Sequence, residues 1–194
     1  MTGTLYLVST PIGNPEDLTL RGRRVLEQAD VIICEEARTG STLLHHYGLV
    51  RPLVELNEHT EESETPTLLE RLVKGESMTL ISDHGTPLLE DPGAALVRGA
   101  ISSGIPIVPV PGASAVTAAV VASGLPANRF RFLGRLPQKA EARRRALSAH
   151  RETRETLVLL DAPYRLMPLL RSLALALGQE RRSAVACNLT TDSE

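Results

Sequence analysis

Residues 80–93, LISDHGTPLLEDPG, begin as an apolar strand and then break off in a loop rich in glycine, proline and acidic side chains. A new helix is expected directly after the loop. A short β-branched run that ends in such a loop and leads into a helix is the repeating unit of a parallel α/β sheet. The stretch therefore predicts one strand–loop–helix unit and raises the question of what the loop holds.

Four other short apolar runs have the same character. The five runs are TLYLVS, VIIC, PLVEL, MTLIS and PIVPV, at residues 4–9, 31–34, 52–56, 78–82 and 106–110. Strands that are apolar along their whole length need cover on both faces, so the runs indicate a parallel sheet between two layers of helices. Residues 18–29 and 65–76 have apolar side chains at helical spacing, and we expect crossover helices there, the second ending near Gly75.

After residues 106–114, PIVPVPGAS, the sequence changes to small apolar residues, and this change predicts a domain boundary there. We expect an N-terminal α/β domain over residues 1–115 and a partial C-terminal α/β domain over residues 116–194. The second domain is expected to contain about three strands and two helices. The strands are predicted at residues 129–134, 156–162 and 183–190, and the helices at residues 139–155 and 164–178.

Composition limits the possible functions. A formal net charge of −2 excludes a protein coated with positive charge for nucleic acid, so any RNA contact has to be local. Cys34 and Cys187 show no Cys-x-x-Cys spacing, and His45 and His46 point to different faces of an expected helix, so no metal site is predicted. The N-terminal apolar run is too short for a signal peptide or a membrane span, and we expect a cytoplasmic protein without a membrane partner.

The unusual residues of the first domain lie in the turns directly after four of its strands. These turns are STPIGNPEDLT, CEEARTGS, SDHGTPLLEDPG and PVPGASA, at residues 9–19, 34–41, 82–93 and 109–115. Ligands of open α/β sheets bind at this carboxyl edge. Neither GxxxxGK[ST] nor GxGxxG is present, and the acidic loop suits a ligand with an ammonium or sulfonium group better than a pyrophosphate. The alternative is that glycine and proline serve here only as turn formers.

Five segments, in this order, resemble the family of small-subunit ribosomal RNA (cytidine) ribose 2′-O-methyltransferases, which belongs to the tetrapyrrole-methylase-like superfamily. The segments are GTLYLVSTPIGNPEDLTLRGRRVL, CEEARTGSTLLHHYG, SDHGTPLLEDPG, PVPGASAVTAAVVASGLP and FLGRLP. The resemblance covers nearly the whole chain. It implies two α/β domains, S-adenosylmethionine in a cleft between them, and methyl transfer to a ribose 2′-hydroxyl of small-subunit ribosomal RNA.

The same resemblance assigns residues to roles. The cofactor-binding residues it implies are Pro11, Asp83, Gly85, Thr86, Pro87, Gly112, Ala113 and Ser114. On the substrate side it implies Arg38 as a phosphate contact and Glu35 as a base for the ribose hydroxyl, although Glu35 could equally be a structural acid paired with Arg38. Arg143 and Arg144 lie in a basic run that could track RNA phosphates, or could belong to an ordinary solvated helix face.

The chain also departs from the family pattern. The residues that differ include His84, Glu36, Ala37 and Tyr164, and the chain ends before the strands and helix that normally complete the family's second domain. An uncovered last strand would expose backbone donors and acceptors, so we expect a homodimer that covers it, with a compensating rearrangement or poor stability as the alternatives. Two other functions stay open: a methylase of a tetrapyrrole or another small molecule, and a cofactor-binding protein without catalysis.

Overall fold

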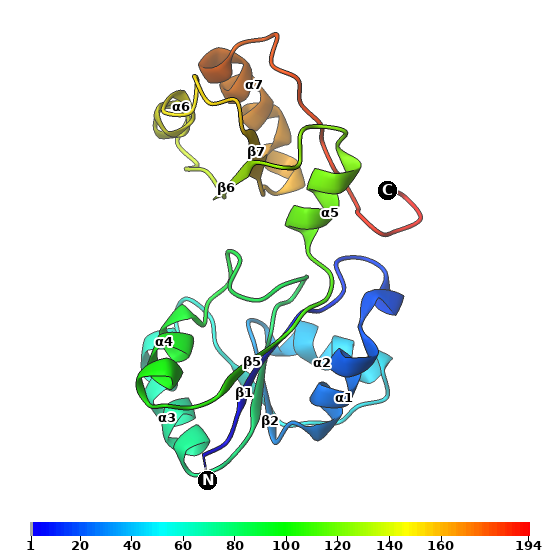
Figure 1. Cartoon of the computed structure of the whole chain (residues 1–194), viewed down its shortest axis with the longest axis vertical. Helices are drawn as coiled ribbons and strands as arrows, with labels where there is room; N and C mark the ends of the chain where they lie inside the picture. The colour runs from blue at the N-terminus through cyan, green and yellow to red at the C-terminus, as the bar shows by residue number, and fades with distance from the viewer. Residues whose placement is uncertain (1) are drawn as a thin grey trace. The chain divides into compact units, whose positions relative to one another are not determined.

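The computed structural model describes residues 2–194 and divides the chain into two compact units (Figure 1). The first unit runs to Ala115 and also includes Thr190–Ser193, and the second comprises Val116–Leu189 together with Glu194. Each unit has its own sheet and its own core.

The first unit is built on a five-stranded parallel sheet with strand order β3-β2-β4-β1-β5. The strands are β1 (Leu5–Val8), β2 (Val31–Cys34), β3 (Leu53–Glu55), β4 (Met78–Ile81) and β5 (Ile107–Val110). Each lies within one of the five apolar runs, so the prediction of a parallel α/β sheet is confirmed. All side chains of β2 and β4 are buried, as expected for inner strands with helices on both faces.

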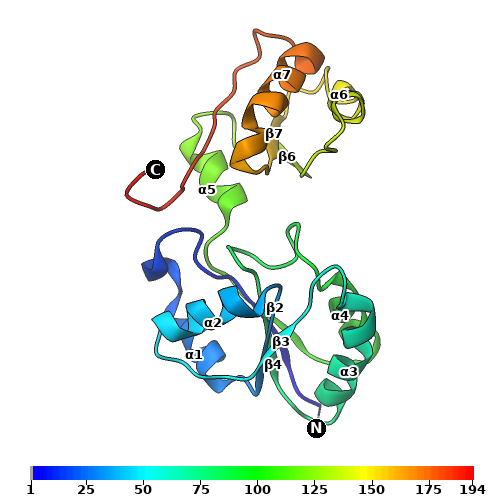
Figure 2. The same cartoon turned by 180° about the vertical axis from the view of Figure 1, so that it is seen from behind.

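Four helices cover the two faces of this sheet. Figures 1 and 2 show α1 (Leu20–Gln28) and α2 (Ala37–His46) on one face, and α3 (Glu61–Val73) and α4 (Ala94–Ser102) on the other. A short 3-10 turn, η1 (Pro15–Asp17), precedes α1. The helix expected at residues 65–76 is therefore α3, which begins four residues earlier.

Two buried clusters fill the space between the sheet and its helices. One joins Ile33 and Leu80 to Leu68 and Leu96 of α3 and α4, and the other joins Ile32 to α1 and α2. Ile32 and Ile33 are neighbours on β2 and serve opposite clusters because successive side chains of a strand point to opposite faces. Packing on both faces therefore fixes the register of the sheet.

Polar side chains cap the amino-terminal ends of α1, α2 and α4. Thr19 Oγ1 accepts a hydrogen bond of 2.9 Å from Gly22 N and caps α1. Glu55 Oε1 accepts from Ala37 N at 2.8 Å at the start of α2. Glu61 Oε1 accepts from Gly93 N and Ala95 N, each at 3.0 Å, and so caps α4 from α3. These caps fix where the segments after β2 and β4 become helical.

The second unit contains a two-stranded parallel sheet. Its strands are β6 (Phe130–Gly134) and β7 (Thr156–Leu159). The helices are α5 (Ala115–Ala122), α6 (Ala140–Ser148) and α7 (Leu166–Leu177), with a 3-10 turn, η2 (Pro163–Arg165), before α7. Leu147 of α6 and Leu169 of α7 lie in the same buried cluster.

The third strand predicted for this unit, at residues 183–190, does not form. Val185 is 53% exposed, and the side chains of residues 183–188 are all exposed. A strand is stabilised by pairing with a neighbour and by burying one face. This segment has only two large apolar residues, Val185 and Leu189, which is too little apolar surface for either.

Within residues 2–194, no helix combines the length and the apolar character that crossing a bilayer requires.

Candidate functional site

The topology of the first unit marks β1 and β4 as the place where a ligand would sit. β1 and β4 are neighbours in the sheet, but the chain leaves them in opposite directions: through α1 toward β2, and through α4 toward β5. The two helices cover opposite faces (Figure 1). In open α/β sheets ligands bind outside the carboxyl ends of such strands. Residues 9–14 and 82–93 follow these two strands.

Thr10 joins the two loops from a fully buried position. Its backbone nitrogen donates to Gly85 O at 2.9 Å, and Gly85 N donates back to Thr10 Oγ1 at 3.1 Å. Thr10 Oγ1 also donates to Ser82 O at 2.9 Å. Thr10 is 0% exposed, so water cannot reach its polar groups, and these hydrogen bonds satisfy them instead. The loop after β4 is therefore fastened to the end of β1.

Thr86 connects these loops to the segment after β5. Thr86 Oγ1 donates to Ala113 O at 3.1 Å and lies 3.1 Å from Ser9 Oγ. A threonine hydroxyl has one proton, so Ser9 must be the donor in the second bond. Ser9 N in turn donates to Val110 O at 3.2 Å. Three of the four loops predicted to form the site are thus held in one hydrogen-bonded network.

The backbone of the 82–93 loop takes conformations that most residues avoid. Gly85 and Gly93 have φ angles of +89° and +114°, and Leu88 and Glu90 have φ angles of 72° and 77°. A Cβ at Gly85 would come within 3.0 Å of Ile12 Cγ2. Left-handed backbone at residues other than glycine costs free energy and is concentrated at ligand sites.

Asp83 has a partly buried carboxyl group in this loop. Its pKa lies above the ordinary value, mainly because of burial. The charges of Glu36 and Asp91 also raise the pKa, whereas a hydrogen bond with the Glu36 backbone and the nearby His84 lower it. In the part of the chain that the structure describes, Asp83 Oδ1 is buried without a hydrogen-bond partner. A buried carboxylate oxygen that no protein group satisfies is able to accept a hydrogen bond from a ligand.

Cys34, at the end of β2, is inert. Burial is the main cause that raises its pKa to about 12, and the charges of Asp83 and Glu55 add to the effect. The thiolate is the nucleophile, and a thiol with this pKa stays protonated at neutral pH. Cys34 therefore contributes packing to the site and no covalent chemistry.

All eight residues predicted to bind a cofactor lie in the first unit. Pro11, Gly85 and Pro87 are buried, Asp83, Thr86, Ala113 and Ser114 are half-buried, and Gly112 is exposed. The predicted substrate residues of this unit follow β2: Glu35 is half-buried, and Arg38 is exposed in the first turn of α2. The sequence did not single out Ser9 and Thr10, because their roles depend on contacts with Thr86 and Gly85, which are distant in sequence.

The structure corrects the prediction for Arg143. Its side chain belongs to the second unit and is 5% exposed. Its guanidinium group donates to Ser172 Oγ at 2.9 Å and to Gln138 O at 2.9 Å. A guanidinium that is buried and already paired is not available to RNA phosphates. Arg144, the neighbouring predicted contact, is exposed on α6.

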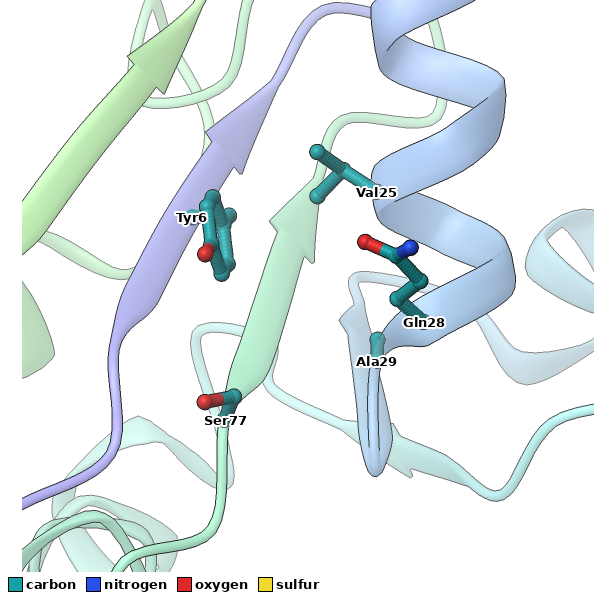
Figure 3. A pocket seen from close by; sticks show the side chains of 5 residues that line it. All are labelled: Tyr6, Val25, Gln28, Ala29 and Ser77. Carbon is teal, nitrogen blue, oxygen red and sulfur yellow. The ribbon is translucent and has the colours of Figure 1, made fainter.

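One pocket of about 230 Å³ lies elsewhere in the first unit (Figure 3). It is lined by Tyr6, Val25, Gln28, Ala29 and Ser77. Ala29 precedes β2 and Ser77 precedes β4, so the pocket opens at the amino-terminal edge of the sheet. It is separate from the carboxyl-edge network, which remains the candidate site.

Comparison with known proteins identifies the family of this chain and solved structures that share its fold. The family model described as Tetrapyrrole (Corrin/Porphyrin) Methylases matches residues 4–194. The solved structure of native uroporphyrin III C-methyltransferase from Thermus thermophilus matches with a TM-score of 0.63 and 25% identity, covering 92% of this chain and 78% of that one. A diphthine synthase structure has a TM-score of 0.64, with 21% identity, 89% of this chain and 73% of that chain covered, and supports the fold alone.

Curated relatives are considerably closer in sequence. Proteins named ribosomal RNA small subunit methyltransferase I are 45% identical in Micromonospora olivasterospora and 44% identical in Pseudomonas aeruginosa, covering 100% and 99% of this chain. The chain spans 61% and 68% of the length of these two relatives. It therefore belongs to the tetrapyrrole (corrin/porphyrin) methylase family, and within that family to the group of the ribosomal RNA small subunit methyltransferase I proteins.

Proposed function

We propose that this chain binds S-adenosylmethionine at the carboxyl edge of its five-stranded sheet and transfers a methyl group to a ribose 2′-hydroxyl of small-subunit ribosomal RNA. The observation that carries the proposal is the identity of 41–45% with eight relatives that share one name, over 97–100% of this chain. The network at β1, β4 and β5 supports it independently, because it is a rigid rim with an unused acceptor.

The residues at this edge fit the cofactor. S-adenosylmethionine has an ammonium group and a sulfonium group, and its reactive methyl is attached to the sulfonium. Asp83 Oδ1, buried and without a partner among residues 2–194, would accept a hydrogen bond from the ammonium group. Gly85 and Gly112 carry no Cβ where the loops after β1, β4 and β5 come close together, which lets these loops pack against one another and form the rim.

The substrate side is assigned to the segment after β2. Methyl transfer to oxygen is an in-line displacement, so the positions of the reacting atoms account for much of the rate. Glu35 would accept the proton of the ribose hydroxyl, and Arg38, exposed on α2, would hold an RNA phosphate. Arg144 would add a phosphate contact from the second unit, while Arg143 is excluded by its burial.

The proposal extends to assembly and location. Ribosomal RNA as the acceptor implies a cytoplasmic protein that meets the small subunit or its RNA. We also propose a homodimer, because the two-stranded sheet of the second unit has two open edges whose backbone groups need partners. Sedimentation velocity of the full chain at several concentrations tests the dimer.

The function is tested by incorporation of radioactive methyl groups from S-adenosylmethionine. The acceptors are small ribosomal subunits, free small-subunit RNA and a tetrapyrrole, and cofactor affinity is measured in parallel by calorimetry. We expect incorporation into ribosomal RNA, with the label located at a 2′-hydroxyl. Label in the tetrapyrrole alone would make the chain a small-molecule methylase, and affinity without any transfer would make it a binding protein.

Two variants and a control locate the chemistry. Asp83→Ala is expected to weaken cofactor affinity, and Glu35→Gln to lower turnover with cofactor affinity unchanged. Glu58→Ala is the matched control, because the Glu58 side chain is 85% exposed on the loop after β3. Full turnover by a folded Glu35→Gln variant would remove Glu35 from the role of base.

A further inference from the structure

Two loops of the second unit are fastened together by a buried arginine. Arg165 Nε lies 3.1 Å from Asp161 Oδ1, and Arg165 Nη2 donates to Leu136 O at 2.8 Å. The Arg165 and Asp161 side chains are 14% and 8% exposed. Leu136 follows β6 and Asp161 follows β7, so this arginine ties the carboxyl ends of the two parallel strands.

Arg143 fastens the loop after β6 a second time, here to α7. Its Nη1 atom donates to Gln138 O at 2.9 Å in the loop after β6, and its Nη2 atom donates to Pro168 O at 3.3 Å in the first turn of α7. Its Nε atom donates to Ser172 Oγ at 2.9 Å on the same helix. The loop after β6 is therefore held twice: by Arg165 against the loop after β7, and by Arg143 against the start of α7.

Three side chains of these fastened loops point to solvent instead. Tyr164, in η2, is 82% exposed, against 41% for Phe130, the other aromatic residue with a large exposed fraction. Arg135 and Lys139 are exposed in the loop after β6, and neither forms an ion pair within the described residues 2–194. We call Arg135, Lys139 and Tyr164 the clamped surface.

We propose that the clamped surface binds an unpaired segment of RNA, with a base stacked on Tyr164 and backbone phosphates held by Arg135 and Lys139. Proteins that bind single-stranded nucleic acid combine an aromatic stacking platform with a cationic track, and both occur here on loops that are already rigid. Rigid loops bind without the entropic cost of ordering them. The site rests on the proposed function, to which it adds a second contact with the acceptor RNA.

The stacking contact is tested with a fluorescein-labelled hexauridylate and the full chain, without S-adenosylmethionine. Fluorescence anisotropy gives the dissociation constant for the unmodified protein, Tyr164→Phe and Tyr164→Ala. A stacked base contributes enough that its loss weakens binding by about tenfold. We expect this loss for Tyr164→Ala and near-normal binding for Tyr164→Phe, which keeps the ring. Equal binding by a folded Tyr164→Ala variant, or equal loss in both variants, would overturn stacking.

The phosphate contacts are tested through the salt dependence of the same binding. Each phosphate contact on single-stranded RNA contributes roughly 0.7 to the slope of log K against log salt concentration. Arg135→Ala and Lys139→Ala should each reduce the slope by about that amount. Arg154→Ala is the matched control, because Arg154 is exposed in the same unit outside the clamped surface. Unchanged slopes for both test variants, or the same reduction for the control, would contradict the proposal.

These measurements separate the clamped surface from the proposed function. A chain that binds the hexauridylate through Tyr164 but transfers no methyl group to any acceptor would keep the surface and overturn the methyltransferase. A chain that methylates ribosomal RNA equally well with Tyr164→Ala, at the same KM for RNA, would keep the methyltransferase and overturn the surface.

Discussion

Thr10 and Gly85 exchange hydrogen bonds between the ends of β1 and β4: Thr10 N donates to Gly85 O at 2.9 Å, and Gly85 N donates to Thr10 Oγ1 at 3.1 Å. Thr10 Oγ1 also donates to Ser82 O. One buried hydroxyl thus satisfies a donor and an acceptor of the loop that carries Asp83. The shape of the candidate cofactor site depends on this side chain.

Replacing Thr10 with valine keeps the shape of the side chain and removes the hydroxyl. Gly85 N and Ser82 O are then left unsatisfied in the interior, which costs about 1–3 kcal/mol of unfolding free energy. Urea unfolding measures this loss, and calorimetry should show weaker S-adenosylmethionine binding. The control is Thr42→Val, because the exposed Thr42 hydroxyl donates only to Arg38 O within its own helix. Equal stability of the two variants would show that the Thr10 bonds contribute little.

Gly85→Ala and Gly104→Ala separate two costs of a side chain at a left-handed position. The φ angles are +89° and +66°, but a Cβ at Gly85 meets Ile12 Cγ2 at 3.0 Å and a Cβ at Gly104 meets nothing within 4 Å. Gly104→Ala should cost about 1 kcal/mol for its backbone conformation alone. Gly85→Ala should cost more in urea unfolding and should also weaken cofactor binding, whereas Gly104→Ala should leave binding unchanged.

Much of the fold follows from local sequence, and the failures have physical causes. The five strands of the first unit are recognisable because continuous apolar runs such as VIIC have few alternatives to a buried strand. The segment 183–190 looked similar, but pairing depends on a neighbour that local sequence does not describe. Arg143, Arg144 and Arg145 are consecutive, and the local sequence does not show that Arg143 is the one whose side chain turns inward.

Only part of the candidate site was predictable from the sequence, because the rest depends on contacts between residues that are distant in the chain. Loop composition indicated a ligand site in residues 82–93, and the family resemblance assigned Asp83 and Gly85 to it. The role of Thr10 depends on a contact with a residue 75 positions away, and no local pattern encodes that contact.

Asp83→Asn should stabilise the free protein while impairing its function. Because burial raises the pKa of Asp83, the folded chain holds that proton more tightly than the unfolded chain, and the ionised carboxylate destabilises the fold. This cost is absent below the unfolded pKa and grows as pH rises through the folded value. At pH 7 the variant should unfold at a higher urea concentration than the original chain, and the gain should shrink toward pH 4. Cofactor affinity should fall, because the amide carries no charge for an ammonium group.

The two cysteines should differ sharply toward a thiol reagent. Cys187 is exposed and should react in the native protein, whereas Cys34 is buried with a pKa of about 12 and should react only after unfolding. The raised pKa has no effect on stability below the unfolded value of 9.0, and it lowers the stability of the folded state as pH rises from there toward 12. Counting reactive thiols at pH 8, with and without urea, checks the prediction. Two equivalents in the native protein would contradict it.

Arg165→Met should destabilise the second unit strongly, because it leaves the buried Asp161 carboxylate without its cation. Breaking one side of a buried ion pair costs about 3–5 kcal/mol, whereas replacing both partners with neutral groups is often close to neutral. The double variant Asp161→Asn with Arg165→Met should therefore recover much of the loss in urea unfolding. Lys74→Ala is the surface control: its pair with Glu70 is 72% exposed on both sides and should contribute at most about 1 kcal/mol. The same double variant also tests the clamped surface. It removes the Arg165 donor of Leu136 O, so it should stay folded and bind the labelled hexauridylate more weakly.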